Sequence, residues 1–89
     1  MPLISQFYGV LIYIYAEINT QHHLPHFHAK YGEFEAVYDF DANCLSGKLP
    51  RKQQKLVEAW ALLYVDELNA AWIAWQTHGE LIKIRGLGH

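Results

Sequence analysis

Two alternating runs joined by Gly32-Glu33 constrain the fold more than any other feature of this sequence. In residues 26–31 and 34–39, side chains alternate as they do in strands with one buried face. A two-residue connection with glycine first is typical of a type II′ hairpin turn. The turn predicts these cross-strand pairs: His26 with Asp39, His28 with Val37, Lys30 with Glu35, and Tyr31 with Phe34.

This hairpin has two different faces, because successive side chains of a strand point to opposite sides. We expect one face to pack in the core: Phe27, Ala29, Tyr31, Phe34, Ala36 and Tyr38. The other face is expected to be open and chemically active: His26, His28, Lys30, Glu35, Val37 and Asp39.

The remaining sequence shows strand patterns in its first half and helix patterns in its second, which predicts an α+β fold. Residues 7–15 are continuously apolar, as in a central strand buried on both faces. Residues 39–43 resemble a turn, residues 44–49 a short strand, and residues 81–84 an edge strand. We therefore expect a small antiparallel sheet of four to five strands.

Residues 50–78 carry helical periodicity, and Gly79 ends it. Pro50 suits the first turn, and Asp66 is a candidate N-cap for a second helix. One helix bent near Tyr64 and Val65 would produce the same apolar stripe. The sheet is therefore expected to be covered by one long or two short helices, with Trp60, Trp72 and Trp75 in the core.

Length and charge bound the class of protein. The chain has 89 residues, enough for a single domain spanning 1–89. The apolar run 7–16 is too short to cross a bilayer, so we expect no membrane partner. The net charge of −2 argues against binding to duplex DNA. A single cysteine, Cys44, excludes an internal disulfide and fits a cytoplasmic protein, in which we expect this thiol to be buried and inert.

Four of the six histidines fall within residues 22–28. Histidine changes its charge near neutral pH, so such a cluster points to acid–base chemistry, metal ligation or a pH-sensitive surface. Each histidine also has a purely structural interpretation. His26 and His28 could be ordinary strand residues, His22 and His23 ordinary loop residues, and His78 a helix C-terminal residue favoured by the helix dipole.

Three blocks resemble one family: Ile4-Ser5-Gln6-Phe7-Tyr8-Gly9; Pro25-His26-Phe27-His28-Ala29-Lys30-Tyr31-Gly32 followed by Glu35-Ala36; and Gly47-Lys48-Leu49-Pro50-Arg51 before a Trp-bearing helix. In this order and spacing they resemble domain-of-unknown-function family 4160. The resemblance implies a small bacterial protein in a toxin–antitoxin-like, defence or mobile-element setting. It implies no activity.

The first functional hypothesis is a metal-independent phosphodiesterase, or ribonuclease, acting on RNA or small oligonucleotides without a cofactor. His26 and His28 would serve as base and acid, and Lys30 would meet the charge on the phosphoryl oxygens. Asp39, opposite His26, would orient that imidazole. Arg51 and Lys52, from the basic cluster of Lys48, Arg51, Lys52 and Lys55, would bind phosphate if the helix start packs near the hairpin. If the helix start and the histidines of the hairpin lie at opposite ends of the protein, the hypothesis is weakened sharply.

Two alternatives remain open. In the second hypothesis His26 and His28 bind zinc, with His23, His22, Asp39 or Glu35 completing the ligand set. In the third hypothesis the protein catalyses no reaction and is an antitoxin-like or dimerisation module. Its partner would be a second copy, as a homodimer, or a small protein encoded by a neighbouring gene.

Overall fold

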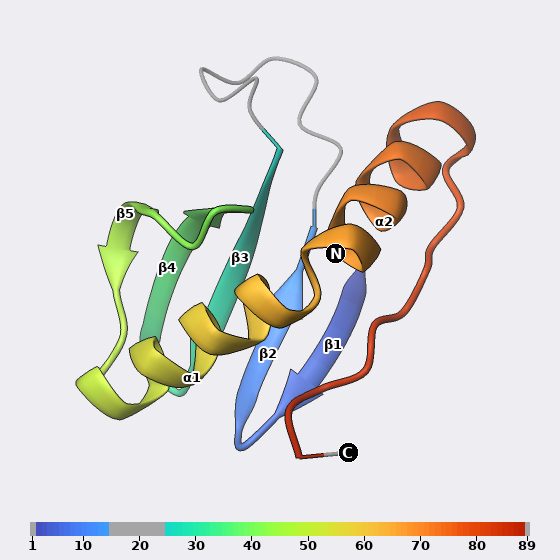
Figure 1. The fold of residues 1–89 in the computed structure, drawn as a ribbon. Coiled ribbons are helices and arrows are strands. Elements are labelled where there is room, and N and C mark those ends of the chain that lie inside the picture. Colours follow the sequence, from blue (N-terminus) through green and yellow to red (C-terminus); the bar gives the residue numbers. More distant parts are fainter. Residues whose placement is uncertain (1, 15–24, 89) are drawn as a thin grey trace.

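A five-stranded antiparallel sheet with two helices on one face makes up residues 2–14 and 25–88, the part of the chain that this computed structural model describes (Figure 1). The predicted α+β fold is confirmed. The strands lie in the sheet in sequence order. The elements are β1 (Leu3–Phe7), β2 (Val10–Tyr13), β3 (His26–Tyr31), β4 (Phe34–Asp39), β5 (Cys44–Lys48), α1 (Arg51–Leu63) and α2 (Val65–His78).

The hairpin of β3 and β4 has the predicted register throughout, from His26 opposite Asp39 to Tyr31 opposite Phe34. Gly32 has φ +56°, which the first central residue of a type II′ turn requires. On the predicted core face, four side chains are at most 1% exposed: Phe27, Ala29, Ala36 and Tyr38. Next to the turn this face opens to solvent, and Phe34 is 42% exposed.

The prediction of one central strand over residues 7–15 is wrong. Tyr8 and Gly9, at φ +46° and +80°, form a tight turn between β1 and β2. Positive φ at both central residues is the geometry of a type I′ hairpin turn, which asparagine and glycine adopt more readily than tyrosine does. Gly9 was therefore the only local sign of the turn within an apolar run. β2 is the second strand of the sheet, and its side chains alternate between buried and partly buried.

The C-terminal segment, residues 79–88, runs beside β1 (Figure 1). It contains no strand, so the prediction of a strand over residues 81–84 is wrong, although the segment does lie at a sheet edge. The Ile84 N–H donates to the Ile4 carbonyl at 2.7 Å, next to a register shift between Leu3 and Ser5. A bulge of this kind interrupts the regular hydrogen-bonding edge that a sixth strand would need.

The helix region contains two helices that meet at Tyr64 (φ −113°, ψ 28°). Pro50 precedes the first helical residue of α1. Asp66 lies in the first turn of α2 and is not its N-cap, because Tyr64 occupies that position. Gly79 ends α2 in the left-handed conformation, as predicted. Of the two alternatives left open by the sequence, two short helices is the observed one.

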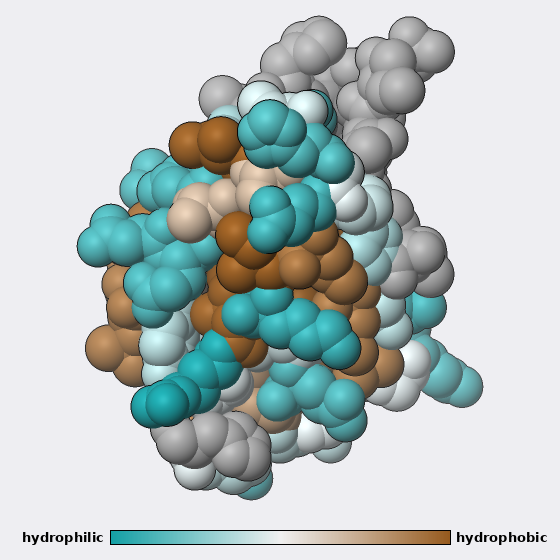
Figure 2. Space-filling view, turned by 90° about the vertical axis from the view of Figure 1, so that its right-hand side faces the viewer, coloured by the Kyte–Doolittle hydropathy of each residue, from teal (hydrophilic) through white to brown (hydrophobic). Residues whose placement is uncertain are grey.

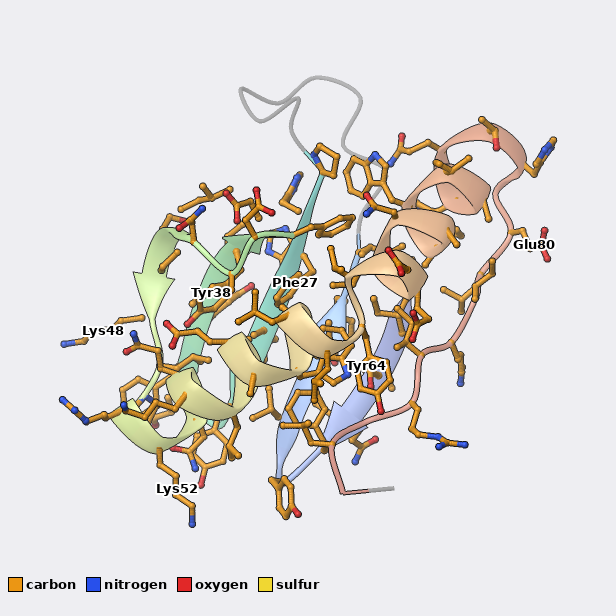
Figure 3. The ribbon with its side chains drawn as sticks, viewed as in Figure 1. Phe27, Tyr38, Lys48, Lys52, Tyr64 and Glu80 are labelled. Carbon is orange, nitrogen blue, oxygen red and sulfur yellow. The ribbon has the colours of Figure 1, made fainter. Side chains whose placement is uncertain are left out.

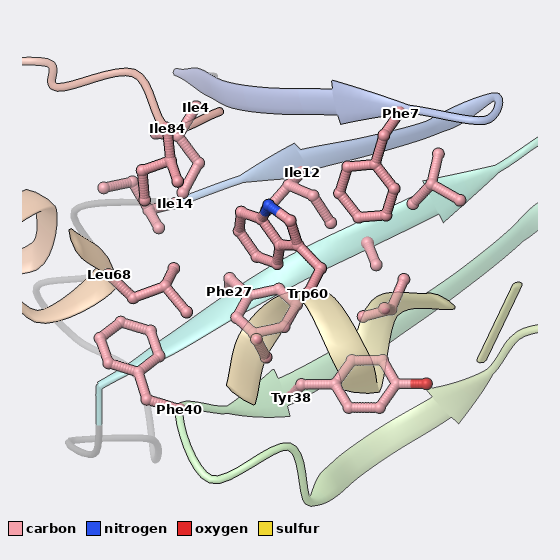
Figure 4. Packing of buried hydrophobic residues seen from close by; sticks show 14 of the residues in the cluster. Ile4, Phe7, Ile12, Ile14, Phe27, Tyr38, Phe40, Trp60, Leu68 and Ile84 are labelled. Carbon is pink, nitrogen blue, oxygen red and sulfur yellow. The ribbon is translucent and has the colours of Figure 1, made fainter. Parts of the chain in front are cut away.

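Trp60 lies at the centre of the core between the helix layer and the sheet (Figure 4). Its side chain is fully buried, and its ring centroid lies 5.4 Å from that of Phe7 and 5.5 Å from that of Phe27. Its indole N–H donates to the Arg85 carbonyl at 2.9 Å. One side chain of α1 thus contacts β1, β3 and the C-terminal segment.

We predict that Gly47→Ala destabilises the protein more than Gly32→Ala. Both glycines have positive φ, which costs an alanine about 1–2 kcal/mol. Only at Gly47 would a Cβ also collide with backbone, at the Glu35 carbonyl and 3.0 Å from the Cα of Ala36; at Gly32 no atom lies within 4 Å. Overpacking adds about 1–3 kcal/mol. Urea unfolding measures both free energies, and equal losses would contradict the β4–β5 packing.

Candidate functional site

The row of His26, His28 and Lys30 lies along β3 as predicted, but its first member is not open to a substrate. His26 is only 1% exposed. Its ring centroid lies 5.4 Å from that of Trp72 in α2 and 5.5 Å from that of His28. The expectation of an open, chemically active face is therefore wrong at His26, because α2 reaches over the start of β3. Sequence alternation identifies the face of a strand but does not show what packs against its end.

Asp39 stands opposite His26 in the register, yet its carboxylate hydrogen-bonds within the following turn. Its Oδ1 accepts from the backbone N–H groups of Asp41 at 3.0 Å and Asn43 at 2.9 Å. Its Oδ2 accepts from the Asn43 side-chain amide at 3.1 Å. Aspartate commonly stabilises turns in this way. These three bonds orient the Asp39 carboxylate toward residues 41–43.

The described residues do bring one pair of titratable side chains together on the open side of the hairpin. His28 Nδ1 lies 3.7 Å from Glu35 Oε2, with the two side chains 16% and 47% exposed. Glu35 faces Lys30 in the register, so its contact with His28 is diagonal. The sequence predicted Lys30 as the cross-strand partner of Glu35 and considered Glu35 beside the histidines only as a metal ligand, although the predicted register already implied the diagonal contact with His28. This pair is the closest arrangement to the predicted acid–base site.

The predicted phosphate ligands lie at the other end of the sheet and on its other face. Arg51 and Lys52 begin α1, just after Lys48, whose register partner is Glu35. Figure 3 shows Lys48 and Lys52 far from the start of β3, where His26 lies. At about 3.3 Å per residue, the Lys30 end of β3 is about 13 Å from His26. The structure therefore does not assemble the two histidines, Lys30, Arg51 and Lys52 into one phosphate-sized site.

A hollow of about 290 Å³ lies near the start of β3, but its lining does not suit a phosphate. The residues around it come from the end of β4 and the turn after it, from α2 and from the residue before β3: Pro25, Asp39, Phe40, Asp41, Val65 and Asn69. Two of the six are carboxylates and none is basic. The negative charges of Asp39 and Asp41 would repel the negative charge of a phosphodiester.

The metal hypothesis needs a third ligand beside His26 and His28, and two of the four candidates, His22 and His23, lie outside the described residues. Within residues 2–14 and 25–88, no group of three histidine, cysteine, aspartate or glutamate side chains is placed to hold a metal ion. Asp39 and Glu35, the other two candidates, are therefore not placed with both histidines to hold a metal ion. The zinc site stays a prediction.

Tyr38 lies in the core as predicted, whereas Cys44 lies differently from its prediction. Tyr38 is 1% exposed and stacks on Phe27 inside the core, with ring centroids 5.6 Å apart. Burial raises its pKa to about 12, with smaller contributions from Cys44 and Glu58. Cys44 is exposed, so the expectation of a buried thiol is wrong. Its Sγ donates to the carbonyls of Ser46 and Gly47, each at 3.4 Å.

Sequence reasoning missed a second apolar stripe on α1. Leu62 and Leu63 are 62% and 67% exposed, and Ala59, one turn earlier, is also exposed. Residues three and four apart are neighbours on a helix, so these three side chains form one patch. The core-facing stripe is separate: Val57, Trp60 and Ala61. The sequence could have shown this patch, because Leu62 and Leu63 are apolar but lie on a different face of the helix from the stripe that packs in the core.

Fold and site together describe a small α+β domain in which a helix covers the start of the histidine-bearing strand and the outer helix surface is partly apolar. The domain of unknown function DUF4160 matches residues 9–73, and the chain belongs to this family. The match includes the blocks around Pro25-His26 and Gly47-Lys48, and it begins at the last residue of the block 4–9. No curated protein and no solved structure matches the chain significantly. None of the helices in the described residues has the length and apolar character needed to span a membrane.

We predict unequal losses of stability for alanine substitutions at the two histidines of β3. His26→Ala should remove buried packing against Trp72 and lower the free energy of unfolding by about 2–4 kcal/mol. His28→Ala removes a partly exposed ring and its ion pair with the exposed Glu35, and it should cost less than His26→Ala. Chemical unfolding of both variants tests this, and an equal or reversed order would contradict the burial of His26.

We predict that the Tyr38 phenol ionises about two pH units above an ordinary tyrosine. Since its pKa is about 12 when folded and near 10.0 when unfolded, the unfolded chain loses this proton first. Stability that is full below pH 10 therefore falls as the pH rises toward 12. Absorbance titration at the tyrosinate band should lose its last step in Tyr38→Phe. If that variant keeps the full late step, another tyrosine is responsible.

Proposed function

We propose that this protein is a non-enzymatic interaction module that binds another protein through the outer face of its helix pair. The setting is the one that the family resemblance implies, a toxin–antitoxin-like or defence system in the bacterial cytoplasm. The observation that carries the proposal is the exposed patch of Ala59, Leu62 and Leu63. A helix needs one apolar stripe to pack on a sheet, and α1 has that stripe around Trp60.

The second apolar stripe is more exposed than isolated surface leucines usually explain. Isolated surface leucines are common, but adjacent apolar side chains that are each more than half exposed favour a binding role. Ile73, on the outer side of α2, is 60% exposed and extends the apolar character along the helix pair. Figure 2, viewed from the right-hand side of Figure 1, shows a brown area in the middle of this face and further brown side chains at the left margin, toward the helix layer.

The geometry of the predicted catalytic residues gives the phosphodiesterase hypothesis less support. His26 is buried, Asp39 hydrogen-bonds within its turn, and the basic start of α1 lies at the other end of the sheet. General acid–base catalysis needs both proton-transfer groups within reach of one substrate. His28 and Lys30 alone lack the second open imidazole that the hypothesis assigned to His26.

We predict no cleavage of short linear or cyclic RNA oligonucleotides by the purified protein in EDTA or in zinc. The panel should include His28→Ala as a matched control, because His28 is the more exposed histidine of the pair. Product formation by the wild type that His28→Ala abolishes, with an unchanged thermal melt, would restore the phosphodiesterase hypothesis. Cleavage seen only with zinc would instead support the metal hypothesis.

We predict that a photo-crosslinking amino acid at position 63 traps a discrete protein partner in cells that carry the native gene neighbourhood. The matched control is the same amino acid at position 46, because Ser46 is exposed on β5, away from the helix layer. Intact-mass analysis of the adducts distinguishes a second copy from another protein. Equal adduct yields at positions 63 and 46 would contradict a binding role for the helix surface.

A further inference from the structure

The exposed ridge of α1 carries charge and apolar groups in a self-complementary order. The turns at its N-terminal end carry the basic residues Arg51, Lys52 and Lys55, and no acidic residue lies in the first turn. Ala59 and Leu62 follow on the same ridge. Asp66 and Glu67 then occupy the first turn of α2, just after Tyr64. All of these residues other than Tyr64 are exposed.

Lys55, Ala59 and Leu62 follow one another at steps of four and three residues on one side of α1. Asp66 lies beyond the break at Tyr64, in the first turn of α2, so the basic groups are at one end of the apolar residues and the acidic groups at the other. An antiparallel copy centred on the apolar residues would place Ala59 against Leu62 twice, and it would bring the basic end that holds Lys55 toward the acidic first turn of α2 that holds Asp66. Opposite charges then meet at both ends, and a small side chain faces a large one in the middle.

A depression at the basic end provides room for the acidic residues of the second copy. It has a volume of about 240 Å³ and is lined by Arg51, Gln54, Lys55 and Glu58. The one carboxylate among these four accepts a hydrogen bond from Gln54 Nε2 at 3.2 Å. Two cations border the depression, so incoming carboxylates from Asp66 and Glu67 would find a net positive surface.

We infer that a second copy of this chain binds the outer face of the helix pair in antiparallel orientation. Ala59 and Leu62 of both copies lie at the centre, and the basic start of each α1 faces the acidic first turn of the other copy's α2. This inference rests on the proposed interaction role and names its partner. Because the ridge complements itself, a second copy can cover its apolar residues and pair its charges without any other protein.

The test is light-scattering mass measurement after size exclusion, over a concentration series into the high micromolar range. We expect the wild type to shift from monomer toward dimer and to dissociate as salt is added, because exposed charge pairs are screened. Leu62→Glu should abolish the shift. Ser46→Glu, which adds the same charge on β5, should leave it unchanged.

Charge reversal tests the orientation. Lys55→Glu and Asp66→Lys each place like charges together at both ends of the pair, so each should weaken association about tenfold. The double variant exchanges the charges and should restore association to within about threefold of wild type. The sites are exposed, and circular-dichroism melts verify that every variant is folded.

Each outcome decides one point. The inference is overturned if the wild type is a monomer at every concentration. It is also overturned if the wild type dimerises but the single charge reversals do not weaken the dimer, or if the double variant does not restore dimerisation. A monomer that binds RNA in a Lys55-dependent way also overturns it and assigns the basic end to nucleic acid. If the protein is monomeric while position 63 traps a different protein in cells, the proposed function stands and the self-pairing fails. If neither is seen, both fail.

Discussion

The burial of Trp60 is the interaction on which the rest of the structure depends. Its indole fills the space between α1 and the sheet, contacts Phe7 and Phe27, and donates its N–H to the Arg85 carbonyl. A buried indole without such an acceptor would lose a hydrogen bond that it has in water. The C-terminal segment therefore completes the core, although its residues form no strand. This contact also determines which side of α1 faces the sheet and which side faces outward.

With that side determined, the break at Tyr64 sets the direction of α2. α2 extends over the start of β3, where Trp72 contacts both His26 and Phe40. The most prominent histidine of the sequence thus becomes part of a packed aromatic group. The same break places Asp66 and Glu67 at the start of a helix, where the dipole favours negative charge.

The sequence predicted local geometry well and long-range packing poorly. The register of β3 and β4 follows from a two-residue turn and from alternation, both of which are local, and every predicted pair is observed. The turn at Tyr8 and Gly9 escaped prediction because tyrosine rarely adopts positive φ and the surrounding run is uniformly apolar. The burial of His26 and the distance of Arg51 from it depend on where the helices lie on the sheet. Neither alternation nor periodicity contains that information.

The charges on α1 oppose its own stability as an isolated helix. Basic side chains in the first turn meet the positive end of the helix dipole, no side chain caps that end, and the last turn has no basic residue. Each unfavourable charge costs about 0.3–1 kcal/mol at an exposed site. The core does not require these charges, because Gln53, Val57 and Trp60 hold the buried side of the helix. A partner that brings carboxylates to this end would offset the cost and would also cover the exposed leucines. One surface would then account for two features that the folded monomer leaves unexplained.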